Sequence, residues 1–482
     1  MSRIEPAARA GDRWSLVAVA GLLSFTAMLD MNVVTIAVGD LARELRVPAA
    51  TAQWAVLGYQ LPLVALLLPV GRWLDRAAVR PALGAALAGF ALGCGAAALA
   101  PSIGWLIAAR LMQGACGSVL FVLMPVLAAG AVRPELRGRA MSVPATLGPL
   151  GAVAGPAIGG LLLDHLGWRA VFLVVPPVCL AAWLTARRAL PSTPPPPRPG
   201  RAALGAAAPA AATVTPPHRP ARAAFGEAGL VAGAVAAVLL GLTFAAGAPG
   251  WALLVLAGIP PAVGWLRRPG GRAVREVLRA GRTAGVHGAV LALGAGFAAT
   301  HLVLALQLQR DGRHSATATG LVLLCFPLAM GVFGPLGGRL ADRFTPRRVA
   351  AAGGALTALG LLSLVPLEAG WSLPSIAWRL ALAGAGTGLY GGPVQALVMA
   401  AAPPGRAATA GAAVQLARSL GFTLGPAPAV ALWSHWGPHP ALFAAFLATA
   451  LAAGLLAVPA RQPRAVPSPD PRRPADAPLD RA

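Results

Sequence analysis

Apolar runs of about 20 residues recur along the whole chain, and they limit its fold more than any other feature. A helix needs about 20 apolar residues to cross the roughly 30 Å hydrocarbon layer of a bilayer. The chain holds about fourteen such runs, and 57% of its 482 residues are hydrophobic whereas 11% are charged. Soluble domains carry about 25% charged residues, so this chain has too few charges to cover a water-facing surface. The sequence therefore predicts an all-α integral membrane protein that has the lipid bilayer as its solvent.

The runs form two groups of six with two shorter runs between them. The first six cover approximately 15–38, 54–70, 82–100, 105–129, 140–163 and 168–186, the two shorter runs cover 228–245 and 251–266, and the last six cover 283–308, 316–337, 349–367, 374–401, 407–433 and 440–458. Residues 187–226 are rich in Pro, Ala and Arg and cannot bury enough apolar surface to fold. We therefore divide the chain into an N-terminal six-helix half (1–186), a cytoplasmic linker (187–226), two inserted helices with a cytoplasmic loop (227–282), a C-terminal six-helix half (283–460) and a disordered tail (461–482).

The arginines gather in short gaps that helix parity places on one side of the membrane. These include Arg72, Arg76 and Arg80, then Arg133, Arg137 and Arg139, then Arg339, Arg343, Arg347 and Arg348. Cytoplasmic loops carry such an excess, so we expect both termini and the linker to be cytoplasmic. Two gaps on the opposite side also carry arginines, Arg43 with Arg46 and Arg310 with Arg313, so the pattern is a bias. The net charge of +23 thus reflects topology, and its distribution excludes a nucleic-acid partner.

Cysteine usage and overall composition narrow the setting of the protein. The four cysteines, Cys94, Cys116, Cys179 and Cys325, lie inside apolar runs. They lack the paired spacing of a metal site or of a loop disulfide, so we expect no metal and no cofactor. The chain has no lysine and is rich in Ala, Gly, Pro and Arg, which indicates a GC-rich genome and the inner membrane of a bacterium. We expect a monomer.

The two halves are similar to each other in sequence. GRWLDRAAVR from Gly71 matches GRLADRFTPR from Gly338, RLMQGACG from Arg110 matches RLALAGAG from Arg379, and GAVAGP from Gly151 matches GFTLGP from Gly421. The paired positions are about 267 to 270 residues apart in all three cases, as a duplicated six-helix unit requires.

Four motifs resemble those of a known family. The loop motif Gly-x-Leu-Ala-Asp-Arg-x-Gly-Arg-Arg is matched at Gly338, Leu340, Ala341, Asp342, Arg343 and Arg347, and more weakly at Gly71, Asp75, Arg76 and Arg80. Arg-x-x-Gln-Gly stands at Arg110, Gln113 and Gly114, the antiporter motif Gly-x-x-x-Gly-Pro-x-x-Gly-Gly is complete at Gly151, Gly155, Pro156, Gly159 and Gly160, and the first-helix motif resembles the stretch from Leu29 to Ala37. The chain therefore resembles the fourteen-helix drug:proton antiporter branch of the major facilitator superfamily over nearly its whole length. Thr345 and Pro346 depart from the loop motif, as do Trp73, Leu74, Ala78 and Val79 in its first copy.

This resemblance implies two halves that rock about a central cavity, with the substrate near the midplane of the membrane. The two added helices would be those of residues 228–266. Gly151, Gly155 and Gly159 recur every four residues and so line one helix face, where a neighbouring backbone can approach closely, while Pro156 weakens the helix beside them. That arrangement suits a sliding or bending gate, and ordinary packing of small residues is the alternative.

Asp75 and Asp342 lie beside arginines at cytoplasmic helix ends. A carboxylate there can accept exposed amide hydrogens and pair with a guanidinium, which would form a latch that breaks as the halves rock. The alternative is a solvated loop charge that only sets topology.

Asp30 is the one acidic residue that falls deep inside an apolar run. Intramembrane carboxylates are costly and are functional-site candidates by default. Asp30 lies about 15 Å and Arg110 about 9 Å from the outer ends of their runs, at 1.5 Å per residue, so their side chains could meet. We expect Asp30 to carry the proton and Arg110 to tune it, because a nearby guanidinium favours the ionised carboxylate. A structural carboxylate bonded to Asn32 or a serine is the alternative.

Other polar residues inside runs could face the cavity, namely Asn32, Gln113, Gln415 and Arg418. The sequence thus predicts a transporter, not an enzyme: a proton-coupled antiporter that exports small apolar or amphipathic compounds, such as drugs, antibiotics or secondary metabolites. An importer or uniporter of the same fold is the nearest alternative. A polytopic membrane enzyme is a more distant one, since it would need His, Asp, Glu or Cys residues that converge at the membrane surface, and the sequence offers no such cluster.

Overall fold

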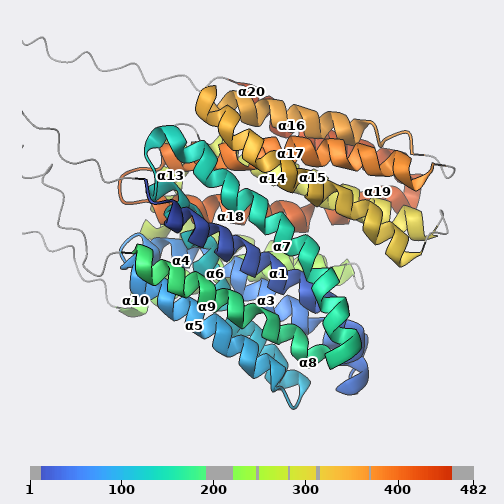
Figure 1. The fold of residues 1–482 in the computed structure, drawn as a ribbon, viewed down its shortest axis with the longest axis horizontal. Helices are drawn as coiled ribbons and strands as arrows, with labels where there is room; N and C mark the ends of the chain where they lie inside the picture. The colour runs from blue at the N-terminus through green and yellow to red at the C-terminus, as the bar shows by residue number, and fades with distance from the viewer. Residues whose placement is uncertain are drawn as a thin grey trace, which may run out of the picture.

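The computed structural model describes residues 12–190, 221–245, 249–280, 283–310, 315–367 and 371–458. All regular secondary structure in these residues is helical. The long helices run roughly parallel to one another, with the first half of the chain packed beside the second (Figure 1). The sequence-based fold class, an all-α bundle of two halves, is confirmed.

The first half is built of long helices and short helical pieces. These are α1 (Trp14–Glu44), α2 (Ala49–Ala52), α3 (Trp54–Ala65), α4 (Leu67–Leu74), α5 (Val79–Ala98), α6 (Ile103–Gly130), η1 (Pro134–Leu136), α7 (Arg137–Leu166), α8 (Trp168–Val171), η2 (Phe172–Val174) and α9 (Val175–Ala189). The bend between α3 and α4 measures 46°, and Pro62 lies in the turn before it. Proline removes one helix hydrogen bond and crowds the preceding turn, which accounts for such a bend.

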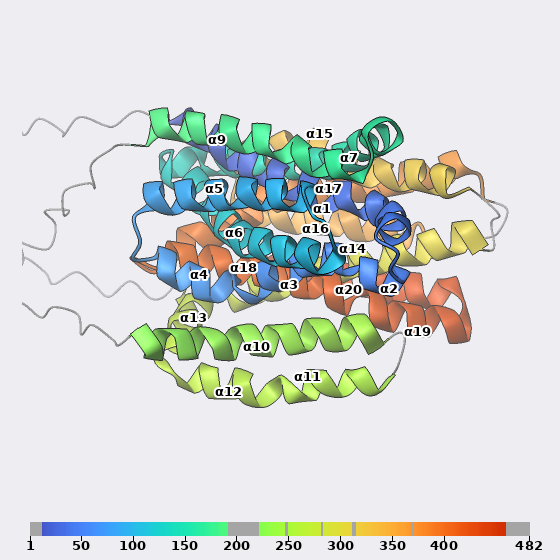
Figure 2. The same ribbon diagram turned by 90° about the horizontal axis from the view of Figure 1, so that it is seen from below.

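The segment between the halves forms helices along one side of the bundle, beside α3 and α4 (Figure 2). They are α10 (Ala221–Ala245), η4 (Pro249–Ala252), α11 (Leu253–Ala257), α12 (Ile259–Arg267) and α13 (Pro269–Arg279). The second half comprises α14 (Ala284–Arg310), α15 (Ala316–Arg343), α16 (Pro346–Leu362), α17 (Leu373–Ala401), α18 (Ala407–Leu424), α19 (Pro426–Trp436) and α20 (Pro438–Ala457).

Each expected apolar run coincides with a helix or with a helix broken at one or two points. Within the described residues, eight helices are long and apolar enough to cross a membrane alone, and the bent pair α3–α4 makes a ninth. The number of fourteen spans therefore stays a prediction. Two expected boundaries differ: α9 continues to Ala189 and α10 begins at Ala221, so the expected linker is partly helical at both ends, and residues 191–220 lie outside the described residues. The expected loop after α12 contains helix α13, whose buried face includes Val274 and Val277.

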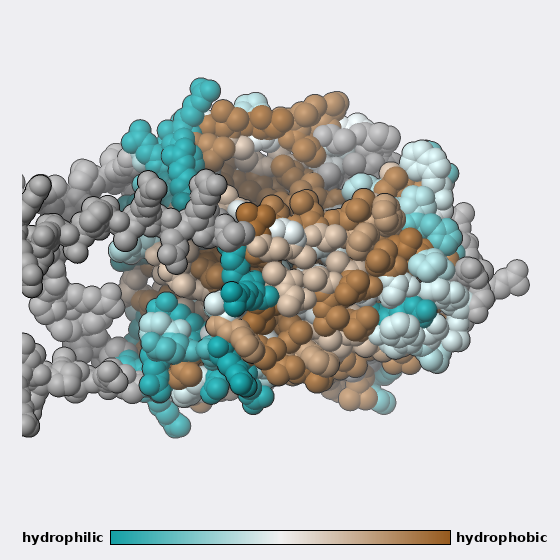
Figure 3. All heavy atoms as spheres, turned by 90° about the horizontal axis from the view of Figure 1, so that it is seen from above, coloured by the Kyte–Doolittle hydropathy of each residue, from teal (hydrophilic) through white to brown (hydrophobic). Residues whose placement is uncertain are grey.

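The surface of the bundle separates into an apolar belt and a charged end. Large apolar side chains on the long helices, such as Leu92, Leu180 and Val332, are more than half exposed. Figure 3 shows a broad hydrophobic band across the middle of the face that it presents. Lipid tails are the solvent that such a band requires. The protein is therefore a multi-pass membrane protein.

One end of the bundle, named the arginine-rich end, carries the arginines of the α4–α5, α6–α7 and α15–α16 connections. Figure 3 shows strongly hydrophilic clusters at one end of the molecule. The Arg13 backbone N–H donates to the Ala131 carbonyl at 2.9 Å, and Leu190 packs in the same cluster as Leu16. The Arg347 Nε donates to the Leu456 carbonyl near the last described residue. The described residues next to both termini, and Leu190 before the linker, therefore lie at this same end. Helix α10 begins there as well, because Glu227 in its second turn pairs with Arg72 of α4.

The repeat seen in the sequence is reproduced in the packing. A Cβ atom added to Gly151 in α7 would lie 2.5 Å from the Phe25 carbonyl oxygen and 3.2 Å from the Leu29 nitrogen in α1. In the second half, a Cβ atom added to Gly421 in α18 would meet the Leu291 carbonyl and would lie 3.1 Å from the Ala295 nitrogen in α14. Helices α1 and α7 thus correspond to α14 and α18.

Candidate functional site

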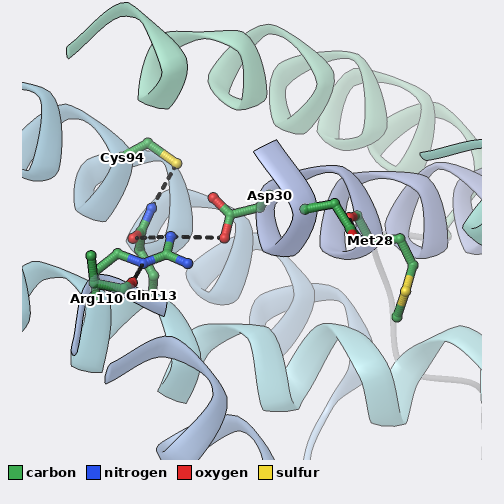
Figure 4. A network of polar contacts seen from close by, with 7 residues as sticks. Met28, Asp30, Cys94, Arg110 and Gln113 are labelled. Carbon is green, nitrogen blue, oxygen red and sulfur yellow. Dashed lines mark hydrogen bonds and ion pairs between the residues drawn. The ribbon is translucent and has the colours of Figure 1, made fainter. Parts of the chain in front are cut away.

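Asp30 and Arg110 form an ion pair inside the first half. Arg110 Nη1 lies 2.8 Å from Asp30 Oδ2, and both side chains are 0% exposed. Asp30 lies in α1 and Arg110 in α6, and Figure 4 shows their charged groups pointing toward each other between the two helices. The contact predicted from their depths along the helices is present.

Neighbouring residues also accept hydrogen bonds from Arg110 Nε and Nη1. Nε donates to the Ala55 carbonyl at 2.7 Å, and Nη1 also donates to Gln113 Oε1 at 2.8 Å. Gln113 in turn donates from Nε2 to Cys94 Sγ at 2.9 Å, as Figure 4 shows. The Arg110 guanidinium also lies 4.6 Å from the centre of the Tyr59 ring. Residues of four helices therefore fix the orientation of this one side chain.

Glycines bring α3 close enough to α6 for this network to form. A Cβ atom added to Gly58 would lie 3.3 Å from Arg110 Cβ, and one added to Gly114 would overlap the Tyr59 carbonyl. Gly114 of the Arg-x-x-Gln-Gly motif thus permits close packing of the helix that supplies Ala55 and Tyr59.

Part of the network has no hydrogen-bond partner among the described residues. The buried atoms without one include Asp30 Oδ1, Arg110 Nη2 and the Tyr59 hydroxyl. A buried polar atom without a partner is costly and calls for a physical explanation. The free Asp30 oxygen is the position where the carboxylate could accept a proton while Oδ2 keeps its bond to Arg110.

The second half lacks this ion pair. Because Leu29 and Ala295 occupy matching positions against α7 and α18, Asp30 corresponds to Gly296. Arg379, which matches Arg110 in sequence, donates to the Ser375 carbonyl and lies 4.0 Å from the centre of the Trp371 ring. The charged site therefore belongs to the first half alone among the described residues.

The glycines of the antiporter motif lie against α1, close to the turn that carries Asp30. A Cβ atom added to Gly155 would lie 2.8 Å from Asn32 Cβ and 3.0 Å from the Val33 nitrogen, and one added to Gly159 would lie 3.1 Å from the Val33 carbonyl oxygen. A Cβ atom added to Gly160 would have no neighbouring atom within 4 Å. Pro156 lies in α7, and its side chain is outside the described part of the structure. The expected glycine face is present, although a gating role for it stays a prediction.

Asp75 joins the first half to the second at the arginine-rich end. Its Oδ1 accepts the backbone N–H groups of Ala408 at 2.9 Å and Thr409 at 3.2 Å, at the start of α18, and its Oδ2 accepts the Thr409 hydroxyl. Gly71 permits this approach, because a Cβ atom there would lie 2.6 Å from Ala412 Cβ. The carboxylate thus satisfies amide groups that a helix start leaves unpaired.

Asp342 makes the matching contact in the opposite direction. Its Oδ2 accepts the Arg139 backbone N–H at 3.2 Å and lies 3.3 Å from Arg139 Nε, at the start of α7. A Cβ atom added to Gly338 would lie 2.7 Å from the Gly138 carbonyl oxygen. The two halves therefore meet at the arginine-rich end through two reciprocal carboxylate contacts.

The four arginines of the loop motifs have different surroundings. Arg347 donates to the carbonyls of Leu456 and Leu455 at the end of α20. Arg343 lies 5.8 Å from the centre of the Phe344 ring, and Arg76 is exposed. Arg80 lines a cavity beside α9. Only the aspartates among the loop-motif charges link the two halves in the described residues.

The four expected cavity residues are not brought together. The Asn32 amide donates to the Met28 carbonyl of its own helix, and Gln113 belongs to the Arg110 network. Gln415 is 2% exposed and its Oε1 accepts from Gln395 Nε2 at 3.4 Å. Arg418 is partly exposed, and it has no hydrogen bond or ion pair within the described residues.

Sequence reasoning missed Tyr59 and Cys94 as members of the Asp30 network. Both are lone polar or weakly polar residues in apolar helices, and nothing in their local sequence distinguishes them from packing residues. Their role follows from the neighbours that α3, α5 and α6 acquire on folding. No group of three or more His, Cys, Asp or Glu side chains that could hold a metal ion occurs in the part of the chain that the structure describes.

Comparisons with known proteins agree with this architecture. The sequence profile of the Major Facilitator Superfamily matches residues 20–209 and 286–481. The uncharacterized transporter YebQ of Escherichia coli (strain K12) is 28% identical over 442 residues, which cover 91% of this chain and 93% of YebQ. Multidrug resistance protein Stp of Mycobacterium tuberculosis is 28% identical over 429 residues, which cover 86% of this chain and 75% of Stp.

A third relative matches part of the chain, and one solved structure matches nearly the whole of it. The tetracenomycin C resistance and export protein of Streptomyces glaucescens is 35% identical over 177 residues, which cover 36% of this chain and 32% of that protein. The crystal structure of the human organic anion transporter MFSD10 covers 94% of this chain and 100% of its own, with a TM-score of 0.62 and 18% identity. At that identity the likeness concerns the fold alone.

Proposed function

The chain belongs to the Major Facilitator Superfamily, and from that premise we propose that it is a proton-coupled antiporter that exports small apolar or amphipathic compounds. The observation that carries this proposal is the Asp30–Arg110 ion pair, with both side chains 0% exposed. An acid and a base enclosed among apolar helices are costly to maintain, and such residues commonly mark proton relays in transporters.

The proposed coupling uses the one free oxygen of Asp30. While Arg110 remains at 2.8 Å, its positive charge favours the ionised carboxylate and therefore proton release. If α1 and α6 separate during transport, the carboxylate loses this partner in an apolar setting and takes up a proton. Because α1 also packs on the glycine face of α7, a shift of α1 would tie the protonation of Asp30 to the relative motion of the halves.

The contacts between the halves suit a state that is closed at the arginine-rich end. Asp75 holds the start of α18, and Asp342 holds the start of α7. Rupture of both contacts would let that end open, which is the step that alternating access requires. From the positive-inside bias we propose that this end, both termini and the linker face the cytoplasm of a bacterial cell.

The relatives support export as the direction of transport. Stp is a multidrug resistance protein, and the Streptomyces glaucescens relative is a resistance and export protein. The complete antiporter motif from Gly151 to Gly160 points the same way. Few charges lie inside the helices, which favours apolar or amphipathic substrates, drugs and antibiotics among them. We propose that the protein acts as a monomer, with a small molecule and protons as its only ligands in transport.

An importer or uniporter of the same fold is the second candidate, because the ion pair does not by itself set a direction. Proteoliposomes that hold the purified protein test both. A pH gradient with the acidic side inside the vesicles should drive uptake of a cationic dye, such as ethidium, against its concentration gradient, and the dye should trigger proton release from detergent-solubilised protein. Uptake only with the acidic side outside would indicate a proton-coupled importer. Transport that ignores the pH gradient would leave the uniporter as the better description.

A further inference from the structure

A cavity of about 560 Å³ lies between α5 and α9, away from the Asp30 network and the contacts between the halves. Its walls come from the first turns of α5, with Arg80 and Gly84, and from the last turns of α9, with Trp183, Arg187 and Leu190. Helices α5 and α9 lie side by side on the outer face of the first half (Figures 1 and 2). The cavity is therefore at the arginine-rich end, next to the apolar belt.

The cavity offers positive charge that the described residues leave unpaired. Arg80 and Arg187 make no hydrogen bond and no ion pair with any described residue. The Arg187 guanidinium lies 4.4 Å from the centre of the Trp183 ring, which holds it at the cavity. Arg80 stands in the first turn of α5, whose cap residue Ala78 makes no side-chain hydrogen bond. The helix dipole disfavours a cation at the start of a helix. An anion bound there would be stabilised both by the dipole and by the Arg80 guanidinium.

The matching place in the second half is filled by the protein itself. Arg347, which corresponds to Arg80, donates to the carbonyls of Leu456 and Leu455 at the end of α20. Thr345, which corresponds to Ala78, caps α16 by accepting the Arg348 N–H at 3.4 Å. The two copies of the loop motif thus differ. In the second copy the arginine donates hydrogen bonds to protein carbonyls, whereas in the first copy the matching Arg80 lines a cavity and has no such acceptor among the described residues.

We propose that this cavity binds the headgroup of an anionic phospholipid, with Arg80 and Arg187 on the phosphate and the acyl chains along the exposed side chains of α9. Leu180 and Leu184 continue from the cavity along the outer face of that helix, 55% and 44% exposed. Guanidinium groups bind phosphate oxygens through two parallel hydrogen bonds, and tryptophan favours the level of the headgroups. Basic pockets between helices at a membrane surface suit such lipids. The adjoining residues 191–220 carry arginines and no acidic residue, so charge disfavours them as the occupant.

Native mass spectrometry of the purified full-length chain tests the proposal. Phosphatidylglycerol and phosphatidylcholine are titrated against the wild type, against Arg80→Gln with Arg187→Gln, and against Arg188→Gln with Arg348→Gln. The control pair removes two exposed arginines from the same end that do not line the cavity. We expect the wild type and the control to prefer phosphatidylglycerol, and the cavity variant to bind it about tenfold more weakly.

Gly84→Leu provides a test that keeps both arginines. A Cβ atom at Gly84 would lie 3.6 Å from Trp183 Nε1, which is an ordinary van der Waals contact. The rest of the leucine side chain would occupy cavity space and should weaken binding of phosphatidylglycerol to a similar extent. Equal loss in the control pair would mean general charge attraction and would overturn the proposal. A wild type that binds both lipids equally would also overturn it, and would be expected if a segment of the chain occupied the cavity. Displacement of the lipid by millimolar inorganic phosphate would overturn it as well, because it would indicate a site for a soluble anion.

Discussion

Asp75 Oδ1 accepts the Ala408 backbone N–H at 2.9 Å, so a carboxylate at the end of α4 caps the start of α18 in the other half of the protein. The Asp342 contact with Arg139 repeats this arrangement with the halves exchanged. Two helix starts, one in each half, thus depend on an acceptor from the other half. Separation of the halves must leave these amides to water or to new partners.

Removal of either acceptor should therefore open the arginine-rich end. Asp75→Ala leaves two amides and one hydroxyl without their acceptor, at a cost of about 1 to 2 kcal/mol, or roughly a 5- to 30-fold shift toward the open form. Asp342→Ala should act in the same direction. Spin labels at the exposed residues Glu135 and Phe344, in a background with the four cysteines replaced by alanine, report the distance between the halves. An unchanged distance distribution in both variants would refute the role of these contacts.

Closure should also depend on pH through Asp75. Burial raises the pKa of the Asp75 carboxyl above its usual range, and outweighs the hydrogen bonds from Thr409 and Ala408 that lower it. In the open form water surrounds the carboxyl group, and its pKa returns to the ordinary value of an aspartate. Protonation of Asp75 therefore favours the closed form. This stabilisation of the closed form is complete when the pH is below the pKa of Asp75 in the open form, and it is lost as the pH rises through the raised pKa of the closed form.

The same spin-label pair measures this dependence, with Asp342→Asn in the background so that only one of the two contacts titrates. We expect the closed population to grow on acidification, and Asp75→Asn, which keeps an acceptor but cannot ionise, to remove the dependence on pH. Equal pH profiles with Asp and with Asn at position 75 would assign the effect to another group.

Asp30→Asn should abolish efflux driven by a pH gradient while insertion and substrate binding persist. The amide can still accept from Arg110 but cannot carry a proton. Asp40→Asn is the matched control, since Asp40 lies in the same helix and pairs with Arg43 near its end. Proton release on substrate addition is the measurement, and release from Asp30→Asn at the wild-type level would place coupling elsewhere.

Arg110→Ala should shift the pH optimum of transport or uncouple it, because Asp30 would lose the cation at 2.8 Å. Arg379→Ala is its control in the second half, where the guanidinium bonds to Ser375 and faces no carboxylate among the described residues. Both variants are compared by efflux across a pH series in proteoliposomes. Matching profiles for the two would show that the ion pair serves packing alone.

Gly155→Leu should block transport although the protein still inserts. Its side chain would collide with Asn32 and Val33 in α1, at a cost of about 1 to 3 kcal/mol from overpacking. Gly160→Leu is the matched control, because it adds the same side chain at another glycine of the motif, where nothing lies within 4 Å of an added Cβ atom. This control should transport normally. Normal efflux by Gly155→Leu at wild-type abundance would reduce the motif to ordinary packing.

The sequence alone determined the membrane setting, the approximate helices and the two-fold repeat. Runs such as 82–100 and 440–458 must be helical in lipid because every backbone polar group has to be paired within its own segment. Local pattern therefore suffices for them. It also suffices to mark Asp30 and the glycines of α7, since a carboxylate or a glycine face inside an apolar run stands out without knowledge of its neighbours.

The contact of Asp30 with Arg110 could be predicted from their depths in the membrane, but only the tertiary structure decided the partners of the other charged residues. Asp75 and Ala408 are separated by more than 300 residues, and no local pattern could indicate that one caps the other. The structure likewise distinguished Arg80, which faces a cavity, from its sequence counterpart Arg347, which binds the end of α20. The reason is physical: the position of an apolar run determines which segment crosses the bilayer as a helix, whereas the partner of a charged side chain depends on which helix packs beside it.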